Sequence, residues 1–258
     1  MKKLVLVLMA TMMVLLSSVS AAAEETKEPV RILQAAGARL GASYGWGSAG
    51  DISFDCSGLV WRALFDCGYT HVNGRPIPMG TAIWREYLQY VNVGDTVTFT
   101  GNGLSLNYIL TSKDARSYFE IPGSILLYND HIVLSAGAYD QNEKSAIDFV
   151  REQYGIDATG YTADGSEKCY LYTGDKTLCI EAFGTQRGEG NRGVIVSDSV
   201  FSNKQIVACL VPEKEYREMV AAKEAAALKE AEEQKEPKPV IMPEKKVFRL
   251  KHFRLNSR

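Results

Sequence analysis

The stretch that decides the fold is GASYGWGSAGDISFDCSGLV, residues 41–60 of the 258-residue chain. Its first half is rich in glycine, which favours a loop. Its last residues open an apolar run with helical spacing, and Asp55 ahead of that run is typical of a helix start. We therefore expect Cys56 at or near a helix N-terminus. Backbone N–H groups and the positive end of the helix dipole favour the thiolate there, which is the reactive form of cysteine.

A thiolate nucleophile usually needs a histidine beside it, and the chain holds three. His71 lies in a polar stretch flanked by glycine, and His252 lies in a basic C-terminal segment. His131 opens the run DHIVLSAGAY, which is suited to a buried strand, and follows another strand-like run, SILLYN. A single histidine at a strand start is usually structural. Because His131 has the rigid setting that holds an imidazole in place, we predict that it pairs with Cys56.

Composition excludes several classes of protein. The chain has 29 Lys and Arg against 31 Asp and Glu, a formal net charge of −2, which argues against a nucleic-acid binder. Five cysteines are too sparse for a small disulfide scaffold. The sequence has no CxxC, HExxH or GxxxxGK[ST] pattern, so we expect no metal site, no phosphate-binding loop and no cofactor.

The N-terminus has the pattern of a secretory signal peptide. Lys2 and Lys3 precede an apolar run, and Ala21 and Ala23 fit the small-x-small pattern of a cleavage site. The run is shorter than the about 20 residues that a spanning helix needs. We expect residues 1–23 to be removed and the mature protein to be secreted, to the periplasm or cell envelope, without a stable membrane span.

The rest of the chain divides by composition into a body, residues 24–212, and a tail, residues 213–258. We expect the body to be one domain. The tail begins with an Ala-, Glu- and Lys-rich stretch that predicts a solvated helix, continues with a proline-rich connector and ends in alternating basic and apolar residues. This basic end is a contact with the envelope, an added strand or a dispensable terminus.

The stretch 41–60 resembles the signature of the NlpC-type family of cell-wall cysteine peptidases, a Tyr-x-Trp-Gly loop followed by Asp-Cys-Ser-Gly at a helix start. RPIPMGTAIWREY, IPGSILLYNDHIVLSAG and LCIEAFG resemble later family segments in the same order. The similarity extends from about Val30 to Pro212. It implies an α+β, papain-like fold, in which N-terminal helices with the catalytic cysteine pack on an antiparallel β-sheet that carries the histidine and the third residue.

Carried over by position, the resemblance implies that Cys56 is the nucleophile and His131 the general base. Tyr44 would donate its hydroxyl to the oxyanion beside the Cys56 backbone N–H. The third residue, which orients the imidazole, falls on Glu181, where the family more often has His, Asn or Gln. A carboxylate can accept the imidazole N–H and stabilise the imidazolium. Gln186, in the following loop, is the alternative orienting residue.

Candidates for substrate binding lie in two loops. Trp46, Asp55 and Ser57 surround Cys56 in the signature. Arg187 and Arg192 follow in FGTQRGEGNRGV, where a guanidinium fork would suit the carboxylates of stem peptides, although a solvated loop is equally consistent with the sequence.

Two insertions relative to the family are expected near residues 98–120 and 141–168. The second contains a short helix around residues 146–153. These segments either wall the substrate groove or have no part in binding.

The remaining cysteines are either disulfide-bonded or reduced, and the sequence leaves both open. CYLYTGDKTLC predicts a hairpin that would place Cys169 roughly opposite Cys179. Cys67 and Cys209 are the other two.

The resemblance implies an exported cysteine peptidase that hydrolyses peptidoglycan stem peptides through a Cys thioester, commonly at the bond between D-glutamate and the diamino acid. Peptidoglycan or murein peptides would be its partner. The sequence leaves three alternatives: an amidase or acyltransferase on the same fold, a catalytically inactive wall-binding module, and an envelope scaffold that acts through the tail.

Overall fold

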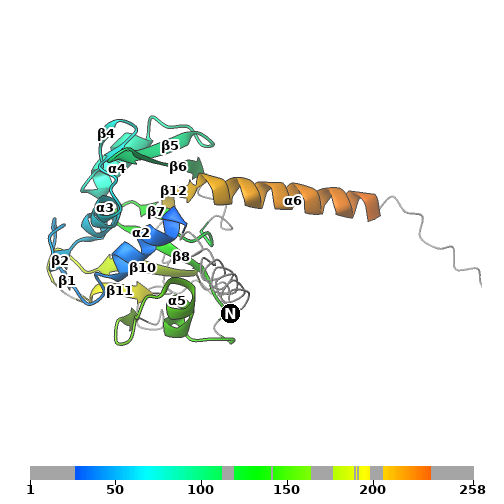
Figure 1. The fold of residues 1–258 in the computed structure, drawn as a ribbon. Helices are drawn as coiled ribbons and strands as arrows, with labels where there is room; N and C mark the ends of the chain where they lie inside the picture. Colours follow the sequence, from blue (N-terminus) through cyan, green and yellow to red (C-terminus); the bar gives the residue numbers. More distant parts are fainter. Residues whose placement is uncertain are drawn as a thin grey trace, which may run out of the picture. The chain divides into compact units, whose positions relative to one another are not determined.

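The computed structural model describes residues 27–111, 119–140, 142–163, 177–188, 190, 192–197 and 206–233, and these form a mixed α+β fold (Figure 1). The predicted α+β class is confirmed. The expected signal peptide lies outside the described residues, as do the proline-rich connector and the basic end of the tail.

The helices follow the predicted apolar periodicity. α2 (Glu28–Gly37) has a proline in its first turn and buries Ile32 and Leu33. α3 (Cys56–Asp66) has Cys56 at its N-terminus, consistent with the prediction that this residue lies at or near a helix start, and is capped by Asp55. The other described helices are α4 (Thr81–Leu88), α5 (Ala146–Tyr154) and α6 (Glu213–Glu233).

One large sheet holds most of the described strands, in the order β4-β3-β5-β6-β12-β7-β8-β10-β11-β9. Its neighbouring strands are antiparallel except β9 and β11, and β1 pairs with β2 in a separate parallel ribbon. The strands are β1 (Ser43–Tyr44), β2 (Ser53–Phe54), β3 (His71–Val72), β4 (Arg75–Pro76), β5 (Thr96–Gly101), β6 (Leu104–Thr111), β7 (Ile125–Tyr128), β8 (Ile132–Ala138), β9 (Thr162–Ala163), β10 (Thr177–Phe183), β11 (Gly193–Ser197) and β12 (Ile206–Pro212).

The core lies between α2, α3 and the middle of the large sheet. Leu59 and Val60 of α3 share one buried cluster with Leu134 of β8 and Ile180 of β10. Leu134 and Ile180 lie opposite each other in the antiparallel pair, and α3 packs against both strands. This packing brings the first turn of α3 toward the two strands that were predicted to carry the histidine and the third residue.

The expected insertion near residues 98–120 is not a loop in its first half. β5 and β6 form a hairpin whose two-residue turn is Asn102-Gly103, and both turn residues have positive φ, 48° and 77°. Asn-Gly is the preferred sequence for such a turn, because both central residues must adopt left-handed backbone conformations. The alternating pattern VTFT and the Asn-Gly pair signalled this hairpin. Residues 112–118 lie outside the described part of the chain.

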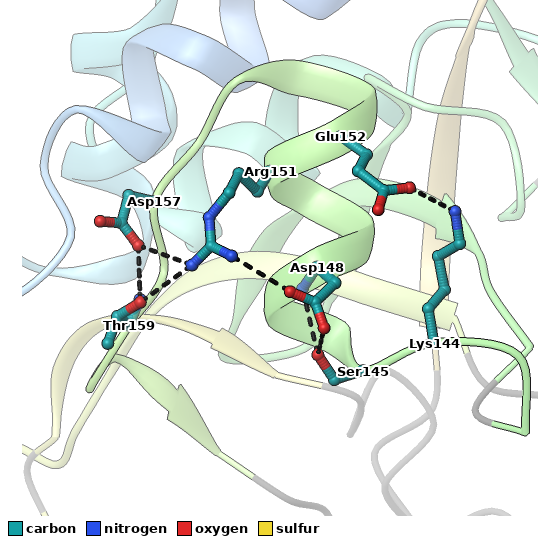
Figure 2. Close-up of polar contacts among 7 residues, drawn as sticks. All are labelled: Lys144, Ser145, Asp148, Arg151, Glu152, Asp157 and Thr159. Carbon is teal, nitrogen blue, oxygen red and sulfur yellow. Dashed lines mark hydrogen bonds and ion pairs between the residues drawn. The ribbon is translucent and has the colours of Figure 1, made fainter.

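The second expected insertion contains the predicted helix, α5. Ser145 caps its N-terminus by accepting the backbone N–H of Asp148, 3.1 Å away. Arg151 makes ion pairs with Asp148 and Asp157, as Figure 2 shows. The buried Tyr154 hydroxyl donates to the Ala136 carbonyl of β8 at 2.5 Å. This part of the segment is therefore a capped helix that is tied to the sheet, and residues 164–168 lie outside the described part.

The tail begins as the predicted helix. α6 has salt bridges at helical spacing, for example between Glu213 and Arg217, and its side chains from 221 to 231 are exposed. It carries charged residues throughout. Within the ranges that the structure describes, none of the helices combines the length and the apolar character needed to cross a bilayer.

Gly58 is a position where a side chain would disturb the loop ahead of α3. A Cβ added there would lie 2.0 Å from the backbone carbonyl oxygen of Ser48, which cannot move without shifting the loop. Because such overpacking strains the backbone, we expect Gly58→Ala to lower the free energy of unfolding by about 3 kcal/mol. Urea denaturation would measure the change.

Gly37→Ala in α2 is the matched control, because the atoms nearest its Cβ belong to the side chain of Ile156, at 2.8 Å, rather than to the backbone. We expect a smaller loss there, since alanine also favours a helix over glycine by about 1 kcal/mol. Equal stability of the Gly58→Ala protein and the wild type would contradict this account of the loop.

Candidate active site

The loop that leads into α3 is fixed by the carboxylate of Asp55. One carboxylate oxygen, Oδ1, accepts the backbone N–H of Gly58 at 2.6 Å and the hydroxyl of Ser57 at 2.9 Å. The other, Oδ2, accepts the backbone N–H of Gly47 at 2.8 Å. Asp55 is therefore both the helix cap and a clamp on the glycine-rich loop, and it sets the position of Cys56, the first residue of the helix.

His131 is placed by the tight connection between β7 and β8. Its carbonyl accepts the backbone N–H of Tyr128 at 2.7 Å, just before β8 begins. Its Nε2 lies 2.5 Å from Oε2 of Glu181, on the neighbouring strand β10. Cys56 also acts on the His131 side chain, because its hydrogen bonding and its charge raise the pKa of the imidazole. Because Nε2 faces the carboxylate, Nδ1 is the ring nitrogen left for the thiol.

The surroundings of His131 favour its protonated form. Burial by itself lowers the pKa of the imidazole, but the hydrogen bonds and charges of Cys56 and Glu181 outweigh burial and raise the pKa to about 10. Glu181 is only 4% exposed, and the His131 side chain is 16% exposed. The imidazolium of His131 therefore lies between Cys56 and the carboxylate of Glu181.

Tyr44 lies on β1, beside the N-terminus of α3. Burial, followed by the negative charges of Cys56 and Asp55, raises the pKa of its phenol to about 12. The hydroxyl therefore stays protonated at neutral pH and remains a hydrogen-bond donor. A donor near the sulfur and the first backbone N–H groups of a helix is what an oxyanion site requires.

The structure thus brings together the four residues that the resemblance assigned to catalysis. The candidates for substrate binding differ from one another in exposure and in hydrogen bonding. Trp46 is 64% exposed in the loop before Cys56. Ser57 is buried and donates its hydroxyl to Asp55. The side chains of Ser57 and Asp55 therefore bond to each other within the loop.

The two arginines after β10 also differ. Arg187 is exposed in the turn after β10. The guanidinium of Arg192 lies over the ring of Phe183, 5.8 Å from its centroid. Gln186, the alternative orienting residue, is exposed in the same turn, whereas Glu181 holds the imidazole.

Two residues at the site were not predicted from the sequence. Cys179 lies two positions before Glu181 on β10, and Ser197 lies opposite Cys179 on β11. Strand periodicity puts Cys179 on the same face as Glu181, so its neighbourhood was readable from the sequence. The position of Ser197 could not be predicted from the sequence, because it depends on the register between β10 and β11.

Two of the other described cysteines, Cys67 and Cys209, differ from Cys56 in the pKa of their thiols. Cys67 and Cys209 are buried free thiols, and burial raises the pKa of Cys67 to about 11 and that of Cys209 to about 12. These two are therefore reduced, and Cys169 lies outside the described residues.

Selective alkylation follows from this difference. At about pH 6 we expect iodoacetamide to label Cys56 at least about tenfold faster than Cys67 or Cys209, because thiolate is the form that reacts. Peptide mapping by mass spectrometry of the native protein would measure the three rates, with the unfolded protein as the reference. Equal rates in the native protein would contradict a preformed thiolate at Cys56.

Within the described ranges, no group of three or more His, Cys, Asp and Glu side chains is arranged to hold a metal ion. Neither the protein-family models nor the curated proteins and solved structures give a match to this chain. The geometry alone defines the class: an α+β protein with a cysteine at a helix N-terminus, joined through a histidine to a buried glutamate on an antiparallel sheet.

Proposed function

We propose that the chain is an exported cysteine peptidase with a papain-like arrangement of its active site, and that it cleaves peptidoglycan stem peptides. The observation that carries the proposal is the contact chain from Cys56 through His131 to Glu181. A cysteine beside a histidine that is oriented by a third group is the arrangement of a nucleophilic catalyst.

The acylation step uses the groups as they lie. The Cys56 thiolate attacks the carbonyl carbon of the scissile amide, and the carbonyl oxygen becomes an oxyanion held by backbone N–H groups and the Tyr44 hydroxyl. The imidazolium of His131 gives its proton to the leaving nitrogen as the C–N bond breaks. The products of this step are a free amine and a thioester on Cys56.

Deacylation returns the site to its starting state. Neutral His131 takes a proton from water, and the resulting hydroxide attacks the thioester carbon. The C–S bond breaks, the product leaves as a carboxylic acid that loses its proton to the solvent, and the thiolate is restored beside the imidazolium. Glu181 stays ionised throughout and stabilises the imidazolium form.

Peptidoglycan as substrate is supported by the sequence signature and by the exposed groups near the site. Trp46 and Ile52 are 64% and 82% exposed in the loop before Cys56, which suits contact with a flat or apolar part of a substrate. Arg187 is exposed beyond Glu181 and would attract the carboxylates of stem peptides. The expected signal peptide would deliver the protein to the compartment that holds the wall.

Incubation of the purified protein with isolated sacculi tests this function. We expect soluble stem-peptide fragments, and their masses, found by mass spectrometry, identify the bond that is cut. Release of amines from simple acyl amides, with intact sacculi, would instead favour an amidase or acyltransferase. Sacculus binding without any released fragment would favour the wall-binding module.

A further inference from the structure

The carboxylate of Glu181 has a second contact on the side away from His131. Its Oε2 faces the imidazole, and its Oε1 accepts a hydrogen bond from the hydroxyl of Ser197. The thiol of Cys179 lies 3.1 Å from the same hydroxyl and 3.8 Å from Oε1. The two carboxylate oxygens therefore have different partners.

The register of β10 and β11 places these groups. Cys179 lies directly opposite Ser197, and Glu181 lies opposite Ile195. Side chains at i and j±2 of an antiparallel pair are diagonal neighbours on one face, so the short serine side chain reaches Glu181. Cys179, Ser197 and Glu181 are 1%, 2% and 4% exposed. In such a setting a carboxylate oxygen needs a protein donor in place of water.

We propose that Ser197 is a positioning residue, which fixes the Glu181 carboxylate so that Oε1 holds the hydroxyl and Oε2 receives the imidazole of His131. The inference rests on the proposed function in one respect, namely that the Cys56–His131 pair is the reactive centre. Ser197 touches no substrate in this scheme and acts through Glu181.

The hydroxyl does two things for the site. It prevents rotation of the carboxylate about its last side-chain bond, so the oxygen that faces the imidazole stays in place. It also stabilises the negative charge of Glu181, because a donated hydrogen bond favours the ionised form of a carboxylate. The ionised carboxylate in turn stabilises the imidazolium, and the imidazolium stabilises the Cys56 thiolate.

The titratable groups around Glu181 come from several strands. His131 precedes β8, Cys179 lies on β10 and Tyr128 lies at the end of β7. Burial, and then the charges of Cys179, Glu181 and Cys209, raise the pKa of Tyr128 well above its usual value. The Tyr128 phenol therefore stays neutral over the pH range of the test. Below pH 10, His131 is the group whose charge depends on Glu181.

The test is the pH profile of Cys56 alkylation by iodoacetamide, which needs no wall substrate. In Ser197→Ala we expect the acidic midpoint of the profile to rise by about one pH unit, which is about a tenfold slower reaction below that midpoint. Ser197→Thr keeps a hydroxyl and should restore most of the wild-type profile. A purely structural role for Ser197 would change stability without moving the midpoint.

Ser135→Ala is the matched control. Ser135 is a buried strand serine on β8, and its hydroxyl donates to the Phe119 carbonyl at 2.5 Å rather than to Glu181. We expect its alkylation midpoint to equal that of the wild type. If Ser197→Ala does not fold, Ser197→Cys keeps the volume with a weaker donor and should shift the midpoint in the same direction by a smaller amount.

Superimposable profiles of wild type, Ser197→Ala and Ser197→Cys would overturn the positioning role. That result is separate from failure of the proposed function. If the wild type shows a reactive Cys56 but releases nothing from sacculi, the substrate assignment fails and the Ser197 test still stands. If the Ser197 variants match the wild type while sacculi are cleaved, the peptidase proposal stands and the inference fails.

Discussion

Cys56→Ala is expected to remove stem-peptide release from sacculi, with a loss of about 10⁴-fold or more, because the Cys56 thiol is the group that forms the thioester. Of the described hydroxyl groups near Cys56, that of Tyr44 stays protonated and serves as a donor, and that of Ser57 donates to Asp55. Mass spectrometry of the soluble products from wild type and variant, at equal protein concentration, measures the ratio.

Cys67→Ala is the matched control for this experiment. Cys67 is the C-cap of the same helix, is a buried free thiol and lies at the opposite end from Cys56. We expect it to keep activity near the wild-type level, with some loss of stability. Activity that survives in Cys56→Ala and is lost in Cys67→Ala would contradict the assignment of the nucleophile.

The local structure around Cys56 could be predicted from the sequence. Asp55 ahead of an apolar run predicted Cys56 at or near a helix N-terminus, and in the structure α3 begins at Cys56 with Asp55 as its cap. The signal was strong because one carboxylate satisfies several backbone donors that otherwise have no partner. The strands β7 and β8 were likewise predicted from two apolar runs around His131.

The sequence did not predict the order of the strands in the large sheet. Strand order in the large sheet depends on pairings such as β12 between β6 and β7, which bring residues far apart in the chain together. Ser197 is near Glu181 only because of the register between β10 and β11. The Asn102-Gly103 turn signal predicts the β5–β6 hairpin, but not its place in the large sheet between β3 and β12.

Glu181→Gln is expected to slow peptide release by about 10³-fold at neutral pH. An amide of the same shape keeps the packing but carries no charge, and its NH₂ can hold the imidazole in the wrong tautomer. The charge and the hydrogen bond of Glu181 are two of the causes that raise the pKa of His131 to about 10 against the effect of burial. Without the charge the pKa of His131 should fall, so the alkaline limit of peptide release should move to lower pH.

The effect of Glu181→Gln on the free energy of unfolding should decrease as the pH rises. A histidine whose pKa is raised from 6.5 to about 10 on folding stabilises the native state fully below pH 6.5, and that contribution is lost as the pH rises through 10. Glu181→Gln removes much of this contribution. The difference in free energy of unfolding between wild type and variant should therefore be larger at pH 6 than at pH 10.

Urea denaturation at pH 6, 8 and 10 measures this difference, and Glu152→Gln is the control. Glu152 also makes an ion pair, with Lys144, but at an exposed position on α5 (Figure 2), where such pairs contribute little. We expect its difference from wild type to stay small at all three pH values. A Glu181→Gln difference that is constant from pH 6 to pH 10 would mean that the carboxylate stabilises the fold without stabilising the imidazolium, and the catalytic role of Glu181 would lose its physical basis.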